Sequence, residues 1–100
     1  MPLTKGQIMA DISEYIRWIG GSFGNCYVGI SKDAVDRLLN GHNVDLRDNG
    51  AYRHYQAASS DEARSIERAF LKLGVQGGDG GGDDDSDMVY VYKITTQTKQ

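Results

Sequence analysis

The run Cys-Tyr-Val-Gly-Ile at residues 26–30 most constrains the fold, because it is β-prone yet carries a glycine among bulkier residues. Strand side chains alternate between two faces, so Tyr27 and Gly29 share one face and the other three residues share the opposite one. Gly29 lets another group approach the backbone on the Tyr27 face. With Arg37 on the next element, we hypothesise that a phenol, a gap and a fixed guanidinium form a cradle for a phosphate.

Three segments carry the signals of amphipathic helices. Each begins with a Ser, Thr or Asp side chain that can cap the first turn, and two of them have Gln or Glu three residues later. Apolar residues then recur every three or four positions, and a glycine follows where each pattern stops. The predicted helices cover 4–20, from 31 or 33 to 41, and 59–73.

Three further segments are predicted strands, at 26–30, 51–58 and 88–94, and the last has the clearest strand pattern. A polar loop with a turn at 48–50 precedes the second strand, and a flexible loop rich in Gly and Asp at 75–87 precedes the third. We expect one α+β domain over residues 1–100. It consists of a three-stranded, mainly antiparallel sheet flanked by three helices, which lie against one face.

Length and composition exclude several classes of protein. One hundred residues suffice for one domain, and no stretch approaches the about 20 apolar residues that span a bilayer. The first residues lack the apolar segment of a signal peptide. A single cysteine excludes an internal disulfide and a zinc site built from several thiolates. We therefore expect a cytoplasmic protein with no membrane partner.

The charge is distributed unevenly along the chain. A net charge of −3 argues against tight, non-specific binding of nucleic acid, but five of the 14 acidic residues lie in one short run. These five are Asp79, Asp83, Asp84, Asp85 and Asp87. Outside this run the chain has 11 Lys and Arg and nine acidic residues, and is therefore slightly basic. A local phosphate site is compatible with this composition. The Asp-rich run lacks the ligand spacing of an EF-hand, which favours a solvated linker over a calcium site.

Glu67 is the strongest candidate for chemistry, because it borders the buried stripe of the third predicted helix. A carboxylate there loses hydration unless it meets a cation or a metal ion. The structural alternative is an ion pair with Arg64, Arg68 or Arg37. His42, at the end of the second helix, can position a nucleophile or contact a phosphate, or it can simply complement the helix dipole.

Two other reactive side chains have plainer explanations. Cys26 alternates inward with Val28 and is expected to pack, so a catalytic Cys–His pair has little support. His54 lies among tyrosines in the second predicted strand, where we expect a packed or surface histidine.

Taken together, these residues resemble the GIY-YIG endonuclease superfamily over residues 26–73. The Tyr-Val-Gly motif at 27–29 stands where the family has its second tyrosine motif, and Arg37 follows its glycine by eight residues, as expected for the family's arginine. His42 lies near the helix end, where members often carry a histidine. The segment Glu-Ala-Arg-Ser-Ile-Glu that ends at Glu67 resembles the helix with the family's metal-binding glutamate.

The family's first strand, with its Gly-Ile-Tyr motif, has no clear counterpart in this sequence. The Tyr-Ile pair at 15–16 lies at about the right distance upstream of Tyr27, but its surroundings predict a helix. If the first strand is missing, the late strand at 89–94 can fill the vacant edge of the sheet. It would then bring Tyr90 or Tyr92 near the site.

The resemblance implies metal-dependent hydrolysis of phosphodiester bonds in nucleic acid, in DNA rather than RNA. Glu67 would hold one Mg²⁺ or Mn²⁺ ion, while Gly29 and Arg37 contact the substrate. Arg37 would also stabilise charge that develops on the phosphorus centre. Tyr27, helped by His42, would deprotonate or orient the attacking water, and a tyrosine base needs a pKa below its usual value of about 10.

Two other functions stay open at this level. One is a catalytically inactive module that has kept the nuclease fold and binds nucleic acid or a protein partner. The missing first motif and the acidic balance favour it. The other is an interaction protein that pairs through the tyrosine-rich strand at 89–94.

Overall fold

The computed structural model describes residues 3–19, 22–45, 47, 51–77, 86–96 and 98. They form helix α1 (Lys5–Trp18), a short 3-10 turn η1 (Phe23–Asn25), strand β1 (Cys26–Ser31), helix α2 (Ala34–Asp36) with a π-helical turn η2 (Arg37–Gly41), strand β2 (Tyr52–Gln56), helix α3 (Ser60–Lys72) and strand β3 (Met88–Lys93). The predicted α+β class is confirmed, and the strand boundaries differ from the predicted ones by at most two residues. The predicted turn at 48–50 and most of the Asp-rich run lie outside the described residues.

Both predicted N-caps begin their helices, and at Thr4 the full capping box with Gln7 is formed. The amide of Gln7 donates to Oγ1 of Thr4 at 3.1 Å, and the amide of Glu62 donates to Oγ of Ser59 at 3.2 Å. These bonds satisfy amide groups that have no partner within the helix. Of the helices in the described ranges, none combines the length and the apolar character needed to cross a bilayer.

The second predicted helix is less regular than expected. Asp33, one of the two cap candidates, accepts a hydrogen bond from the amide of Asp36 at 3.1 Å. The backbone then widens into η2, where the amide of His42 donates to the carbonyl of Arg37, five residues back, at 3.0 Å. Such wide turns are rare and occur often at functional sites. This one leaves the side chain of His42 buried.

Strand β3 is the centre of the sheet, because it pairs antiparallel with β1 on one side and with β2 on the other. The prediction that this strand fills an edge is therefore wrong. Its residues from Val89 to Tyr92 are all buried, which suits a strand that is covered on both faces. Both edges of β3 are already paired, so the strand offers no free edge to another protein. The hypothesis of an interaction protein that pairs through this strand is therefore rejected.

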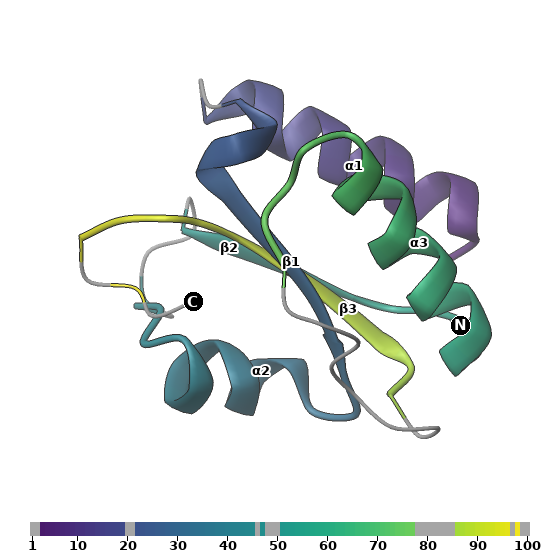
Figure 1. The fold of residues 1–100 in the computed structure, drawn as a ribbon. Coiled ribbons are helices and arrows are strands. Elements are labelled where there is room, and N and C mark those ends of the chain that lie inside the picture. The colour runs from purple at the N-terminus through teal and green to yellow at the C-terminus, as the bar shows by residue number, and fades with distance from the viewer. Residues whose placement is uncertain are drawn as a thin grey trace.

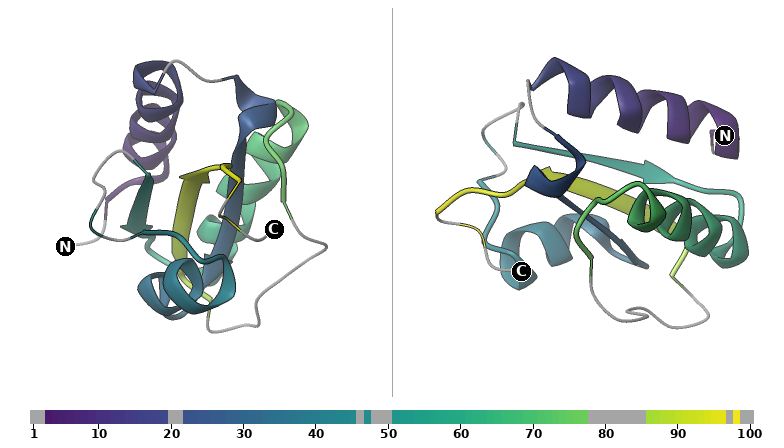
Figure 2. Two further views of the ribbon diagram at one scale, coloured as in Figure 1. Left: turned by 90° about the vertical axis from the view of Figure 1, so that its left-hand side faces the viewer. Right: turned by 45° about the horizontal axis from the view of Figure 1, so that its top comes forward.

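Three helices flank the sheet, but they cover both of its faces. Helices α1 and α3 lie on one side, and α2 with η2 lies on the other, as Figures 1 and 2 show. The expectation that the helices pack against one face is therefore wrong. The cause is β3 itself, in which Val89 and Val91 face α1 and α3 whereas Tyr90 and Tyr92 face α2. Each face of this strand needs its own covering layer.

A segment after α3 extends the sheet beside β1. The amide of Val28 donates to the carbonyl of Gln76, and the amide of Gln76 donates to the carbonyl of Cys26, both at 2.9 Å. These two bonds form a short parallel bridge. Gln76, which we expected in the flexible loop, therefore pairs with β1 at its outer edge.

Candidate functional site

Tyr90 lies directly opposite Gly29 in the pairing of β3 with β1, on the face of the sheet that α2 covers. A Cβ atom added to Gly29 would lie 2.4 Å from both Cζ and Oη of Tyr90. The end of this phenol therefore rests over β1, in the space that a side chain would occupy. Gly29 does admit a group close to the backbone, as its position indicates. That group is Tyr90, so the open patch expected at this position is filled.

The imidazole of His42 lies between two phenols of β3. Its Nε2 is 2.8 Å from Oη of Tyr90, and its Nδ1 is 3.1 Å from Oη of Tyr92. A neutral imidazole has one donor and one acceptor nitrogen, so one phenol donates to the ring and the other accepts from it. The three groups form a continuous chain of hydrogen bonds along which a proton can move.

Tyr27 completes this aromatic cluster from β1. Its ring centroid is 4.7 Å from that of His42 and 5.2 Å from that of Tyr92, on which it is stacked. The antiparallel register is the cause, because Tyr27 is paired directly with Tyr92. Tyr27 is half-buried, whereas the other three rings are buried, so Tyr27 is the ring of the cluster most exposed to solvent.

Burial raises the pKa of both phenols of β3 above the ordinary value for tyrosine. Desolvation, with a smaller contribution from Tyr27, raises the pKa of Tyr90 to about 12, although the charge and hydrogen bond of Arg37 act in the opposite direction. Desolvation likewise raises the pKa of Tyr92 above its ordinary value. The lowered pKa that a tyrosine base requires is therefore not found at either of these two phenols.

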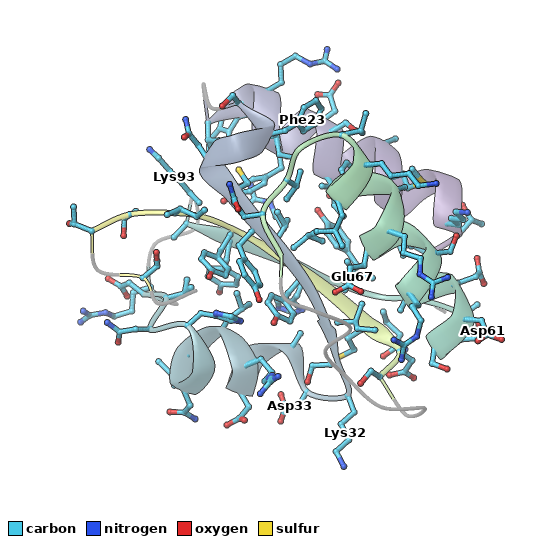
Figure 3. The ribbon with its side chains drawn as sticks, viewed as in Figure 1. Phe23, Lys32, Asp33, Asp61, Glu67 and Lys93 are labelled. Carbon is cyan, nitrogen blue, oxygen red and sulfur yellow. The ribbon has the colours of Figure 1, made fainter. Side chains whose placement is uncertain are left out.

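Arg37 approaches the cluster from η2. Its side chain is exposed, and its charge and hydrogen bonding both act on the phenol of Tyr90. Beside it lies a hollow of about 410 Å³. The hollow is lined by Ile30, Ser31, Lys32, Asp33, Asp36, Arg37 and Ser86. The lining has two cations, two carboxylates and two hydroxyl groups, so its charges balance, and Figure 3 shows Lys32 and Asp33 where β1 turns into α2.

Glu67 is only 4% exposed and points from α3 toward the sheet (Figure 3). Desolvation raises the pKa of its carboxyl group, and the charges of Arg64 and Arg68 offset this in part. The ion pair considered as the structural alternative is not formed: among the described residues, no ion pair within 4.0 Å includes this carboxylate. The carboxylate therefore lies in a desolvated position, where the charges of Arg64 and Arg68 act on it.

A metal ion at this site would have the carboxylate of Glu67 as its one expected protein ligand. In the described ranges, no group of three or more His, Cys, Asp or Glu side chains could hold a metal ion. Mg²⁺ in phosphate-processing sites is commonly bound by one or two carboxylates together with waters and substrate phosphates. Glu67 meets this requirement when a phosphate supplies further oxygen atoms.

Of the predicted site residues, His42 and Arg37 act directly on the phenol of Tyr90, whereas Glu67 acts on it through charge alone. His42 is hydrogen-bonded to it, and the charges of Arg37 and Glu67 act on it from η2 and α3. Tyr27 joins through its ring contact with His42. The hollow beside Arg37 is lined by neither Tyr27 nor Glu67, so the predicted site residues do not share one cavity.

Tyr90 and Tyr92 are absent from the predicted site residues, although we inferred that the late strand brings one of them near the site if the first strand is missing. The signal that could have selected Tyr90 is the glycine at position 29, which leaves space for a large side chain from a paired strand. His54 also faces this side, where it is paired with Tyr90 and stacked on Tyr52 at 6.0 Å. It is exposed, which agrees with a surface histidine.

Cys26 is fully buried in the core beneath α1 and α3. Desolvation raises the pKa of its thiol to about 11, and the charge of Lys93 offsets part of this effect. The packing role is confirmed. A catalytic pair with His42 is excluded, because the two side chains lie on opposite faces of the sheet.

Comparisons with protein-family models, with curated proteins and with solved structures found no match to this chain. The function is therefore inferred from the geometry and electrostatics of the site.

Proposed function

We propose that this chain is a GIY-YIG-like nuclease domain of the cytoplasm that hydrolyses phosphodiester bonds of DNA with one divalent metal ion. The observation that supports the proposal most is the phenol of Tyr90, which is hydrogen-bonded to the imidazole of His42 and on which the guanidinium of Arg37 acts by charge and hydrogen bonding. Packing alone does not explain this arrangement. Burying a charged group is unfavourable unless it is paired, and among the described residues no ion pair within 4.0 Å includes the carboxylate of Glu67.

In this proposal, Tyr90 takes the place of the tyrosine in the family's missing first motif. Tyr27 of the Tyr-Val-Gly motif lies on the neighbouring strand, and the register of β1 with β3 puts both phenols on the face that α2 covers. The first tyrosine then comes from the end of the chain and not from its beginning. The site depends on which strands pair and in which register, so a different chain order can build the same site.

The hydrogen-bonded chain lets the phenol act as a base without ionising beforehand. As water attacks phosphorus, its proton passes to Oη of Tyr90 while Tyr90 transfers its own proton to Nε2 of His42. The raised pKa of Tyr90 is compatible with this step, because no free phenolate forms. His42 must then accept at Nε2, so its ring proton resides on Nδ1 and faces Tyr92.

Arg37 and Glu67 supply the electrostatic part of the reaction. The guanidinium beside Tyr90 would stabilise negative charge that grows on the phosphoryl group in the transition state. Glu67 would hold the metal ion, which when bound polarises a phosphate oxygen. The same ion would compensate the desolvated charge of Glu67.

A second candidate is a module of the same fold that binds nucleic acid or a protein partner without hydrolysis. The raised pKa of Tyr90 favours it, because a protonated phenol is a weak base if His42 does not accept its proton. The hollow beside Arg37 favours it as well, since a phosphate can bind there without contacting Glu67. If the partner is nucleic acid, the two candidates differ only in hydrolysis.

Nicking of supercoiled plasmid DNA with Mg²⁺ or Mn²⁺ tests the proposal. We expect Glu67→Gln and Tyr90→Phe to slow nicking by about 100-fold or more. Glu14→Gln removes an exposed carboxylate from α1 and should keep the wild-type rate. Equal nicking by Glu67→Gln and the wild type would indicate a contaminating nuclease. DNA binding without nicking, weakened by Arg37→Ala, would establish the non-hydrolytic module instead.

A further inference from the structure

A second basic surface lies on the outer side of α3, in a groove between α3 and the start of α1. The groove has a volume of about 550 Å³. It is lined by Lys5, Asp61, Arg64, Ser65, Arg68, Ala69 and Lys72. Four of these side chains are cationic and one is anionic, in a chain whose net charge is −3. The groove is therefore a local concentration of positive charge.

Three of these cations form a row along α3. Arg64, Arg68 and Lys72 follow one another every four residues, which puts them on one helix face at steps of about 6 Å. Like charges at this spacing repel one another, so the row destabilises the helix unless a partner neutralises it. In the part of the chain that the structure describes, no ion pair within 4.0 Å includes Arg68 or Lys72.

Lys5 closes the groove from α1. Its Nζ donates to Oγ of Ser65 at 2.6 Å, which holds the ammonium group over α3. Two elements therefore shape the groove, and it is more than the solvated face of one helix. Asp61, its one carboxylate, lies in the first turn of α3, where it complements the positive end of the helix dipole.

The groove lies next to Glu67 of the proposed hydrolytic site, on the same helix α3. Glu67 lies at one flank of the buried face of α3, and Arg64, three residues earlier, lies between it and the outer face. The charges of Arg64 and Arg68 both act on the carboxyl group of Glu67, so the two regions are within electrostatic reach of each other. A polyanion with one phosphate at Glu67 can therefore continue past Arg64 along the row.

We propose that this groove binds the phosphate backbone of duplex DNA beside the bond that is cleaved. The inference deepens the proposed function and rests on it for the substrate. The row is about 12 Å long and spans about three phosphates of one strand, which advance by about 3.4 Å each along the duplex axis. The lining residues include no aromatic ring, so the groove adds affinity without reading sequence.

Fluorescence anisotropy with a short labelled duplex tests the groove, in a Glu67→Gln background that prevents cleavage. We expect Arg68→Gln with Lys72→Gln to weaken binding about tenfold at low salt and to reduce the slope of log K against log salt by about 2. Arg17→Gln with Lys93→Gln is the matched control, because it removes the same charge from exposed positions. Lys93 lies at the opposite end of the molecule from Asp61 (Figure 3). This control should leave the slope unchanged.

The outcomes separate the groove from the hydrolytic site. Equal slopes for the two double variants would contradict DNA binding by the groove. Nicking by the wild type would in that case still support the proposed function. Groove-dependent binding without any nicking would support the groove and contradict hydrolysis. Poly-glutamate that competes as well as DNA would mark a site for acidic polypeptides and overturn the inference. A wild type that binds no duplex at low salt would overturn both proposals.

Discussion

Oη of Tyr90 lies 2.8 Å from Nε2 of His42, although 48 positions separate the two residues in the chain. Tyr90 is placed by the space over Gly29, and His42 follows the π-helical turn η2. In a buried position, such a hydrogen bond is stronger than in water, and losing one partner is costly. The packing of this face of the sheet and the chemistry that we propose for it therefore depend on the same contact.

The coupling between Tyr90 and His42 can be measured by a double-mutant cycle. His42→Ala leaves two buried phenols without their shared partner, which should lower the free energy of unfolding by about 1–3 kcal/mol. Tyr90→Phe should cost less in the His42→Ala background than in the wild type, by about 0.5–3 kcal/mol. Urea denaturation of the four proteins gives both values.

Tyr55→Phe provides the control for this cycle. Tyr55 donates a hydrogen bond to Asp11 on the opposite face of the sheet and shares no partner with His42. Its effect should therefore add to that of His42→Ala within about 0.5 kcal/mol. Additive effects of Tyr90→Phe and His42→Ala would contradict the hydrogen-bonded chain.

Gly29→Ala should displace the phenol of Tyr90. A Cβ atom at this position would overlap the end of the buried ring, and the close-packed surroundings resist its movement. We expect a loss of about 1–3 kcal/mol in the free energy of unfolding, together with a loss of plasmid nicking.

Gly6→Ala is the matched control for Gly29→Ala. Gly6 lies within α1, is exposed, and has no atom within 4 Å of an added Cβ. Alanine there should stabilise the chain by about 0.5–1 kcal/mol through helix propensity. Wild-type stability and activity of Gly29→Ala would show that Tyr90 does not occupy the space above this glycine.

Glu67→Gln should stabilise the chain in a pH-dependent manner. Burial raises the pKa of Glu67 above 4.5, so the folded state binds this proton more tightly than the unfolded state. The resulting stabilisation is complete below pH 4.5 and is lost as the pH rises through the folded-state pKa. Glutamine stays neutral, so the variant should be more stable than the wild type at pH 7. The difference should shrink as the pH falls through the folded-state pKa towards 4.5 and should change little below that pH.

Urea denaturation across this pH range, with and without Mg²⁺, provides the measurement. A bound metal ion should raise the unfolding midpoint of the wild type and leave that of Glu67→Gln unchanged. A wild type that is more stable than Glu67→Gln at pH 7 in the absence of metal would mean that the carboxylate has an ionic partner within the fold.

Local patterns were sufficient to predict the elements and several of the individual roles. The caps at Thr4 and Ser59 lie within one turn of the amides that they bind, so a short window of sequence contains both partners. The alternation around Cys26 likewise identifies its buried face. Glu67 could be placed beside the buried stripe of α3 because helical periodicity extends over the whole element.

The sequence by itself therefore determined the segments, their order and the faces of each, since these depend on residues a few positions apart. Only the tertiary structure decided that β3 lies between β1 and β2, that α2 covers the face opposite to α1 and α3, and that Tyr90 rests over Gly29. Both faces of β3 are apolar, so its pattern is equally compatible with an edge or a central place. Strand order and register are set by the packing of segments distant along the chain, and no short window of sequence contains both partners of such a contact.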